Sequence, residues 1–192
     1  MNLQKKFIFL FETIRLVDTI PFYLNFHIQR MARSLGFAPK FDLKSVLKTS
    51  QMGLVRAKVI YHKSGELVKV EFFEYKMCEF CEFRLVDIDF EYDKKYLIRD
   101  DINRAKGDNT EIIMIKNGLV TDTSIANIAI FDSKWLTPKT PLLDGTTRQR
   151  LIGEGVLTPY EIDVEMLLKA KKFAIMNAMV GFCEIKNFRF VL

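Results

Sequence analysis

The segment GLVTDTSIAN, residues 118–127, lies between two apolar runs and decides how the central part of the chain folds. Asn117 and Gly118 form a dipeptide typical of a two-residue hairpin turn. The run IIMIK precedes this turn, and IANIAIF closes the segment on its other side. The pattern therefore predicts three short strands, of which the first two form a hairpin.

Helices and further strands are expected on both sides of this segment. Toward the C-terminus, helices are expected at residues 146–153 and 164–171, and the run FAIMNAMVGFCEI predicts two more strands. Toward the N-terminus, an apolar strand over residues 7–17 precedes an amphipathic helix that follows Pro21 and stops at Gly36. Asp42 is placed to cap a second, short helix over residues 42–49.

Residues 54–89 change to a β pattern. Three runs, LVRAKVIYH, ELVKVEFFEY and FCEFRLVDIDF, predict an antiparallel meander. Strands dominate with helices between them, so the expected class is α+β or mixed α/β rather than a doubly wound sheet. The charged stretch that follows marks the expected boundary between a small N-terminal domain, residues 1–87, and a larger C-terminal domain, residues 88–192.

Composition excludes a disordered chain and argues against a nucleic-acid binder. The 192 residues are 49% hydrophobic and 12% aromatic, which is enough apolar surface to form a core. The 29 Lys and Arg exceed the 24 Asp and Glu by a net charge of +5, and no basic run is interleaved with aromatic residues. A small anionic substrate explains this balance, and we expect no nucleic-acid partner.

Cysteine and histidine content favours a cytoplasmic protein without a metal centre. Cys78, Cys81 and Cys183 are too few for a disulfide scaffold, and their odd number leaves one unpaired. Cys78 and Cys81 fall three apart in a segment that alternates like a strand, so their side chains are expected on opposite faces. The two histidines, His27 and His62, complete no zinc pattern. No run is long enough for a membrane helix, and a soluble protein is expected.

Three further stretches carry the chemistry. DKKYLIR at residues 93–99 precedes the central segment, and TP at 137–138 and LLDGTTR at 142–148 follow it. Their order and content resemble the class IV (fold type IV) pyridoxal-phosphate enzymes, which include branched-chain and D-amino acid aminotransferases and 4-amino-4-deoxychorismate lyase. The resemblance implies the two-domain D-amino acid aminotransferase-like fold, with pyridoxal 5′-phosphate as cofactor and a homodimer as the assembly.

The resemblance also implies which residues bind the cofactor. HIQRM at residues 27–31 is similar to the family's H-x-x-R helix, which makes Arg30 the ligand of the cofactor phosphate. Asp122 takes the place of the glutamate that faces the pyridine nitrogen, and Asn127 closes the same motif. Thr146 and Thr147 begin a predicted helix, whose unpaired amides and positive dipole end suit a phosphate.

The Schiff-base lysine has to be chosen between two neighbours. The lyase branch of the family places this lysine four residues before an arginine, and Lys95 with Arg99 has that spacing. Lys94 does not have it, so Lys95 is the predicted catalytic residue. Ile98 replaces the asparagine of the lyase motif, which keeps Lys94 open as the alternative.

A motif near the C-terminus favours the lyase over the aminotransferases. NAMVG, residues 177–181, resembles the lyase's N-[SA]-L-M-G more than the G-T-A-A of the branched-chain aminotransferases. By this resemblance Asn177 and Ala178 are expected cofactor contacts, and Met179 is an expected substrate contact.

The expected reaction converts 4-amino-4-deoxychorismate to p-aminobenzoate and pyruvate for folate biosynthesis. The substrate's two carboxylates require positive partners, for which Arg15 and Arg99 are expected and Arg56 and Arg148 are further candidates. An aminotransferase of branched-chain or D-amino acids is the first alternative, because it uses the same lysine. A degenerate member that binds cofactor without turnover is the second, because Asp122 and Ile98 depart from the family pattern.

The resemblance begins close to residue 7. Family members usually place an N-terminal hairpin before that strand. An N-terminally shortened two-domain enzyme is therefore expected, with a partner subunit covering the sheet edge or site wall that the missing hairpin exposes.

Overall fold

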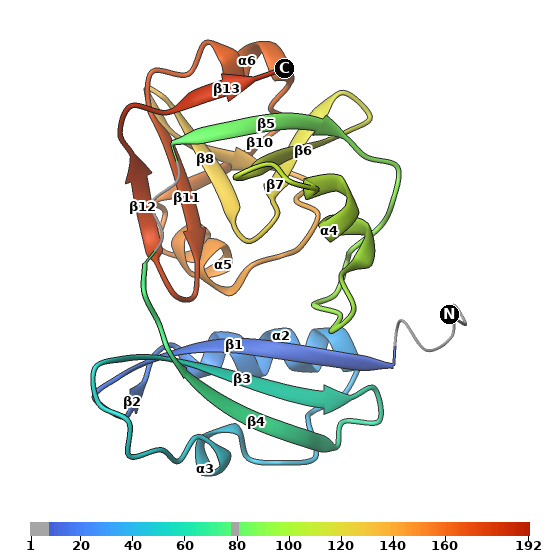
Figure 1. Ribbon diagram of the computed structural model, residues 1–192, viewed down its shortest axis with the longest axis vertical. Coiled ribbons are helices and arrows are strands. Elements are labelled where there is room, and N and C mark those ends of the chain that lie inside the picture. Colours follow the sequence, from blue (N-terminus) through green and yellow to red (C-terminus); the bar gives the residue numbers. More distant parts are fainter. Residues whose placement is uncertain (1–7, 78–80) are drawn as a thin grey trace. The chain divides into compact units, whose positions relative to one another are not determined.

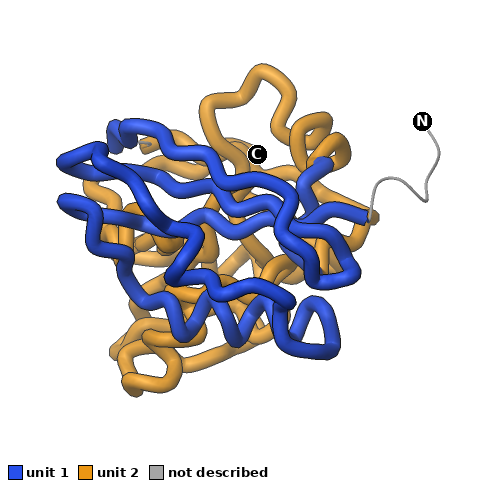
Figure 2. The backbone as a smooth tube through the Cα atoms, turned by 90° about the horizontal axis from the view of Figure 1, so that it is seen from below, with its two compact units in different colours: residues 1–77, 94–98 blue, residues 78–93, 99–192 orange. Residues whose placement is uncertain are grey.

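The computed structural model of the chain describes residues 8–77 and 81–192, and the chain divides into two compact units (Figure 2). Unit 1 is Met1–Met77 with Lys94–Ile98, and unit 2 is Cys78–Asp93 with Arg99–Leu192. The expected halves, residues 1–87 and 88–192, therefore differ from the units in two segments. The residues before 88 that belong to unit 2 include a strand that pairs within that unit.

Unit 1 is a four-stranded sheet in the order β2-β1-β3-β4, with a helix packed on one face (Figure 1). Its elements are β1 (Phe9–Val17), β2 (Ile20–Pro21), α2 (Leu24–Leu35), α3 (Leu43–Val46), β3 (Leu54–His62) and β4 (Leu67–Glu74). The predicted amphipathic helix is confirmed and ends at Gly36, whose φ of 82° favours glycine. Asp42 caps α3 as predicted, by accepting from the amides of Lys44 and Ser45.

The two faces of this sheet carry different side chains, because successive residues of a strand point to opposite sides. Leu10 and Ile14 of β1 pack with Met31 of α2 in a buried core. Burying each of these aliphatic side chains contributes about 1.5–3 kcal/mol. Phe11 and Arg15 alternate with them and lie on the opposite face.

An extended segment, Lys94–Ile98, pairs with the edge of β1. The amide of Phe11 donates to the carbonyl of Lys95 at 2.9 Å, and the amide of Leu97 donates to the carbonyl of Phe9 at 2.9 Å. Because β2 pairs only with the far end of β1, this segment satisfies backbone groups that the sheet itself leaves open. These hydrogen bonds are the reason that the lysine segment belongs to unit 1 rather than to the C-terminal half.

Unit 2 is built on a nine-stranded sheet whose main path is β10-β9-β8-β7-β6-β5-β13, with β11 paired to β8 and β12 (Figure 1). Its core includes Phe83, Ile128 and Phe173. The strands are β5 (Glu82–Asp87), β6 (Ile112–Lys116), β7 (Leu119–Thr123), β8 (Asn127–Asp132), β9 (Lys134–Pro138), β10 (Leu157–Tyr160), β11 (Phe173–Asn177), β12 (Gly181–Ile185) and β13 (Arg189–Val191). The helices are α4 (Asp100–Lys106), α5 (Thr146–Gly153) and α6 (Val164–Leu168).

The central prediction is confirmed, since β6, β7 and β8 are consecutive antiparallel neighbours. Asn117 and Gly118 form the predicted turn with φ of 52° and 76°. The α+β class and the two C-terminal strands are also confirmed. The meander is wrong for its third strand, because β5 leaves β4 and pairs in parallel with β6 and β13. Parallel pairing joins segments that are distant in sequence, which a local pattern does not encode.

The structure also bears on membrane helices, metal clusters and cysteines. Within the part of the chain that the structure describes, no helix is long and apolar enough to cross a bilayer. Among the same residues, no cluster of three His, Cys, Asp or Glu side chains could hold a metal ion. Cys81 and Cys183 are free thiols, whereas Cys78 lies outside the described residues, so the geometry of the Cys78–Cys81 pair stays a prediction.

Candidate functional site

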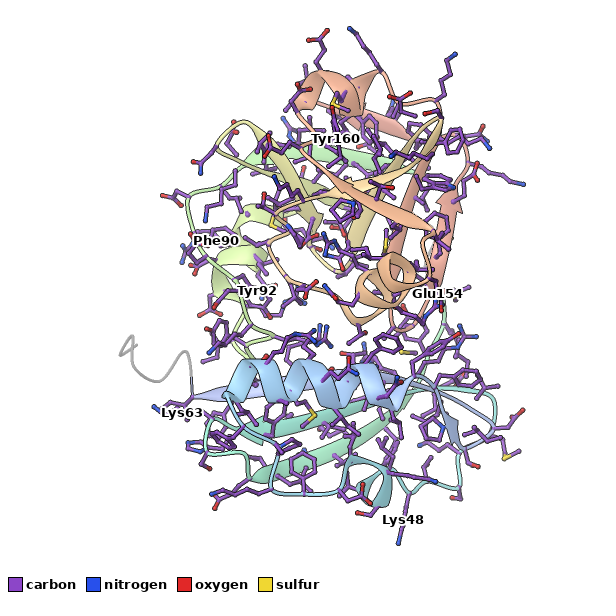
Figure 3. All side chains as sticks on the ribbon, turned by 180° about the vertical axis from the view of Figure 1, so that it is seen from behind. Lys48, Lys63, Phe90, Tyr92, Glu154 and Tyr160 are labelled. Carbon is purple, nitrogen blue, oxygen red and sulfur yellow. The ribbon has the colours of Figure 1, made fainter. Side chains whose placement is uncertain are left out.

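The side chain of Lys95 rests against an aromatic ring of unit 1. Nζ of Lys95 lies 4.6 Å from the centroid of the Phe11 ring, and Nζ of Lys58 lies 5.5 Å from the same centroid. Both are within the range of a cation–π contact. Lys48 and Lys63 of the same unit are exposed and extend outward (Figure 3). Lys95 is thus held at a defined place on the sheet, unlike these surface lysines.

Arg30, the predicted phosphate ligand, is paired with a buried carboxylate of β1. Oε1 of Glu12 accepts a hydrogen bond from Nε of Arg30 at 3.0 Å, and Oε2 accepts one from Nη2. Nδ1 of His27 lies 2.6 Å from the same Oε2. His27 and Arg30 are one turn apart on α2, so both reach the same point of the strand below. The structure therefore joins two residues of the predicted H-x-x-R motif to Glu12.

Burial and charge set the protonation of this cluster. Burial raises the pKa of Glu12, but the Arg30 charge and the His27 hydrogen bond outweigh it and lower that pKa from 4.5 to about 2. Burial lowers the pKa of His27, against the attraction of Glu12. Glu12 is therefore ionised near pH 7, and neutral His27 donates its Nδ1–H to it. The buried hydroxyl of Tyr61 has no hydrogen-bond partner among residues 8–77 and 81–192.

Two arginines meet on the opposite face of the unit 1 sheet. Arg15 and Arg56 are Cα partners in the β1–β3 register, so their side chains are neighbours on one face. The Arg15 guanidinium lies 5.8 Å from the centroid of the Phe22 ring, and that of Arg56 lies 4.9 Å from the centroid of Phe73. Phe11 alternates onto this face as well. Like charges in directly opposite positions repel, and a bound anion relieves that repulsion.

The carboxylate of Asp122 lies at the end of β7 and is buried in unit 2. Oδ1 accepts a hydrogen bond from Nδ2 of Asn127 at 2.6 Å, and Oδ2 accepts one from the amide of Leu143 at 2.8 Å. Burial raises the pKa of Asp122 from 3.8 to about 7, although these hydrogen bonds and the charge of Arg148 act in the opposite direction. Asp122 and Asn127, both predicted site residues, are therefore brought into direct contact.

Helix α5 begins with amides that no side chain caps. Its N-cap residue, Gly145, has no side chain to accept from the first-turn N–H groups, which the helix itself leaves unpaired. Thr146 and Thr147 are buried at the first two positions of the helix. Nη1 of Arg148 pairs with Oδ1 of Asp144 at 3.1 Å, which holds a guanidinium beside the same turn. This donor set, at the positive end of the helix dipole, suits a phosphate.

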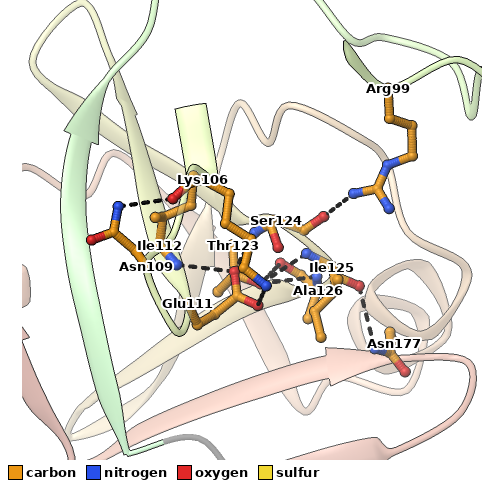
Figure 4. A network of polar contacts seen from close by, with 10 residues as sticks. All are labelled: Arg99, Lys106, Asn109, Glu111, Ile112, Thr123, Ser124, Ile125, Ala126 and Asn177. Carbon is orange, nitrogen blue, oxygen red and sulfur yellow. Dashed lines mark hydrogen bonds and ion pairs between the residues drawn. The ribbon is translucent and has the colours of Figure 1, made fainter. Parts of the chain in front are cut away.

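A second network holds the loop between β7 and β8 (Figure 4). Oε1 of Glu111 accepts from the amides of Ile112 and Ser124, each at 3.0 Å. Nη2 of Arg99 donates to the carbonyl of Ser124, and Oγ1 of Thr123 accepts from the amide of Ala126 at 3.0 Å. Arg99, an expected substrate contact, is thus bound to the backbone of this loop.

The predicted C-terminal motif forms the turn between β11 and β12. Oδ1 of Asn177 accepts from the amides of Met179 and Val180 at 2.8 and 3.0 Å. Its Nδ2 donates to the carbonyl of Ile125 at 3.3 Å, as Figure 4 shows. Ala178 is half-buried and Met179 is buried. Asn177 therefore links this turn to the loop that Glu111 and Arg99 hold.

The chain resembles known proteins in sequence and in fold. A sequence profile described as amino-transferase class IV matches residues 89–188. An uncharacterised protein of Haemophilus influenzae is 34% identical over 186 residues, which cover 90% of this chain and 98% of that protein. The solved structure of a candidate 4-amino-4-deoxychorismate lyase from Haemophilus somnus is 31% identical, has a TM-score of 0.77, and is matched over 91% of this chain and 97% of that one.

This chain belongs to the class IV amino-transferases. Members of that family are pyridoxal-phosphate-dependent enzymes, so the sequence-based resemblance is confirmed at the level of the family. A pyridoxal-phosphate-bound structure of a hypothetical aminotransferase from Mycobacterium tuberculosis has the same fold, with a TM-score of 0.72 and 17% identity over 96% of this chain and 82% of that one.

Three chemical groups of the chain suit pyridoxal phosphate: an amine, a buried acid and a set of uncapped backbone amides. Lys95 carries an amine, Asp122 is a buried acid, and the start of α5 offers uncapped amides. At Gly145 a β-carbon would lie 1.9 Å from Oδ1 of Asn127, so the turn that leads into α5 requires glycine. The residues of this class IV amino-transferase therefore fit pyridoxal phosphate.

Sequence reasoning missed two groups of this class IV amino-transferase. Glu12 is fully buried, and a signal for it exists, because it interrupts the inward-facing apolar series of Leu10 and Ile14. Leu143 takes part through its backbone N–H and carbonyl, for which no side-chain pattern exists.

Proposed function

We propose that the chain is a pyridoxal-phosphate-dependent lyase that converts 4-amino-4-deoxychorismate to p-aminobenzoate and pyruvate. The observation that carries this proposal is the 31% identity, over 91% of the chain, to a candidate lyase of that specificity. The contacts of Lys95 and of the start of α5 support the cofactor requirement. Pyridoxal phosphate supplies the electron sink for the reaction when it is bound.

In this proposal Lys95 moves the protons. Its amine binds the cofactor, takes the proton from C4 of the substrate ring, and returns a proton to the departing enolpyruvyl group, itself or through a water. A lysine acts as a base only when it is neutral, which neighbouring positive charge favours. The side chains of Lys95 and Lys58 both lie over the Phe11 ring of unit 1. Loss of pyruvate leaves an aromatic ring, which makes the elimination favourable.

The substrate carboxylates are assigned to Arg15 and Arg56. Among the four candidate arginines, Arg99 donates to the carbonyl of Ser124, and Arg148 is held by Asp144. Arg15 and Arg56 are direct partners on the adjacent strands β1 and β3, on the face that also carries Phe11, so they place two guanidinium groups side by side. Guanidinium groups are well suited to bind carboxylates in a bidentate manner.

The phosphate of the cofactor is assigned to the amides and hydroxyls at the start of α5, at Thr146 and Thr147. Arg30 is proposed as a phosphate ligand by its sequence motif, and within unit 1 it is paired with Glu12. Asp122, Asn127, Asn177 and Ala178 complete the proposed cofactor contacts. We further propose that the enzyme is cytoplasmic, acts as a homodimer in folate biosynthesis, and binds neither nucleic acid nor membrane. Sedimentation of the purified protein tests the dimer, because a fully active monomer would contradict it.

The cofactor is tested by trapping it on its lysine. Purified protein is mixed with pyridoxal phosphate, reduced with borohydride and digested, and the modified peptide is located by mass spectrometry. We expect the adduct on Lys95, its loss in Lys95→Ala, and its retention in the matched Lys94→Ala variant. An adduct on Lys94 would overturn the assignment of the lysine, and absence of any adduct would overturn the cofactor.

The reaction is tested separately. The lyase releases pyruvate from 4-amino-4-deoxychorismate in the absence of any second substrate. A branched-chain or D-amino acid aminotransferase instead consumes an amino acid together with a 2-oxo acid. Cofactor binding without either reaction would identify a family member that binds cofactor but does not turn over.

A further inference from the structure

Both oxygens of the Asp122 carboxylate are bound by the protein itself. One accepts from the side-chain amide of Asn127 and the other from the backbone amide of Leu143. Asp122 is only 4% exposed, so these N–H groups replace the water that the carboxylate loses on burial. The carboxylate is therefore directed at the loop that precedes α5.

Asn127 holds the same loop residue from its other side. Its Nδ2, which donates to Asp122, also donates to the carbonyl of Leu143 at 2.8 Å. The N–H and the carbonyl of Leu143 are thus both bound, by Asp122 and by Asn127 respectively. We call Asp122, Asn127 and Leu143 the Leu143 clamp.

The clamp continues to Gly145, the residue before helix α5. Oδ1 of Asn127 lies 1.9 Å from the position that a β-carbon of residue 145 would occupy. Gly145 is the N-cap of α5, and the uncapped first-turn amides follow it directly. The loop is short, since Leu143 and Gly145 are two residues apart. A shift at Leu143 therefore moves the amides proposed to bind phosphate.

We propose that Asp122 is a positioning residue for the phosphate end of the ligand: through Leu143 and Gly145 it sets where the N-terminal amides of α5 lie. This inference rests on the proposed function in one respect, that the ligand is pyridoxal phosphate. It assigns to Asp122 an effect on affinity that does not pass through the pyridine nitrogen. An aspartate suits this task because its short side chain reaches the neighbouring loop from the end of β7.

The test measures the binding of two ligands and, separately, the mobility of the loop in the protein without ligand. Binding of pyridoxal phosphate and of its 1-deaza analogue, in which C–H replaces the ring nitrogen, is measured by calorimetry for the wild type, Asp122→Asn and Asp122→Glu. Amide hydrogen exchange of residues 142–147 is measured without ligand. Asp132→Asn is the matched control, since Asp132 is exposed at the end of β8.

We expect Asp122→Asn to weaken binding of the 1-deaza analogue by about tenfold, and binding of pyridoxal phosphate by at least that factor, because one acceptor of the clamp becomes a donor. Exchange of residues 142–147 is expected to accelerate by a similar factor, and the control is expected to change neither quantity. Asp122→Glu is expected to weaken both ligands too, since the longer side chain displaces the loop.

Two results would overturn the proposal. One is a loss of affinity that occurs for pyridoxal phosphate but not for the 1-deaza analogue, which would place the effect at the ring nitrogen. The other is unchanged exchange of residues 142–147 in Asp122→Asn. If the wild type binds neither ligand, the proposed cofactor is wrong, and the exchange measurement still decides whether the clamp exists.

Discussion

The side-chain oxygen of Asn127 occupies the space beside Gly145 so closely that a β-carbon at position 145 would lie 1.9 Å from it. Asn127 is the first residue of β8, and Gly145 is the N-cap of α5, so the pair joins the sheet of unit 2 to the start of a helix. No side chain larger than hydrogen fits there unless Asn127 moves. Because Asn127 also binds Asp122 and Leu143, such a movement breaks other contacts.

Gly145→Ala is therefore expected to destabilise the protein. Forcing a methyl group into this space costs about 1–3 kcal/mol, and affinity for pyridoxal phosphate is expected to fall with it. The free energy of unfolding from urea titration measures the first effect. The control is Gly153→Ala in the same helix, where nothing lies within 4 Å of an added β-carbon. Equal stability of the two variants would show that Asn127 yields without cost.

The buried ion pair of Glu12 is expected to make stability depend on acid pH. The pKa of Glu12 is lowered from 4.5 to about 2 in the folded protein, so its contribution is present above pH 4.5 and is lost as the pH falls toward 2. Glu12→Gln breaks a buried pair and is expected to cost about 3–5 kcal/mol near neutral pH. The loss in free energy of unfolding caused by Glu12→Gln is expected to shrink below pH 4.5. The control is Glu74→Gln at an exposed position, which is expected to change that free energy little. A cost that does not change with pH would contradict the assignment.

The stability that Asp122 contributes is expected to fall as the pH rises, which is opposite to the effect of Glu12. The pKa of Asp122 is raised from 3.8 to about 7, so the folded state holds a proton that the unfolded state has lost, and this contribution is lost as the pH rises through 7. The wild type is therefore expected to lose stability relative to Asp122→Asn between about pH 4 and pH 7, and to change no further above that. Thermal unfolding across this pH range checks the slope. Asp132→Asn should reproduce the wild-type curve.

Arg56→Gln is expected to weaken substrate binding without stopping the reaction. Loss of a hydrogen bond between charged groups costs about 1.5–3 kcal/mol, or roughly a 10- to 150-fold rise in KM. The value of kcat is expected to change little, because a carboxylate away from the reacting carbon is bound equally in the ground and transition states. Arg33→Gln on the exposed side of α2 is the control. A fall in kcat at constant KM would exclude Arg56 as a carboxylate ligand.

Arg99→Ala is expected to act on the loop rather than on the substrate. It removes the donor to the carbonyl of Ser124, and an unsatisfied carbonyl costs about 1–3 kcal/mol. Hydrogen exchange of residues 123–126 is expected to accelerate. An unchanged loop together with a higher KM would restore Arg99 as a substrate contact.

Much of the secondary structure around the site could be predicted from local patterns. The Asn117-Gly118 turn, the strands on either side of it and the bounds of α5 depend on residues that are close in sequence. The departure of β5 from the meander could not be predicted, because its partners β6 and β13 are chosen by long-range packing. The strands β9, β10 and β13 were not predicted either, since they are short and their apolar residues have no clear period.

For the candidate site, local motifs predicted the residues but not their contacts. Motif spacing predicted Arg30, Asp122 and Asn127 as site residues, but the partners of each were not predictable. Glu12 meets Arg30 only because β1 lies under α2, and Leu143 meets Asp122 only because the loop before α5 folds back on β7.

The sequence by itself determined the family of this protein and its class of fold, and it predicted a set of site residues, because turns, periodicity and motif spacing are properties of neighbouring residues. Only the tertiary structure decided what those residues contact. It joined Lys95 to β1, placed Arg15 beside Arg56, and directed Asp122 at Leu143. Each of these contacts joins residues that are distant in sequence, and burial, which makes an unpaired polar group costly, selects the partner.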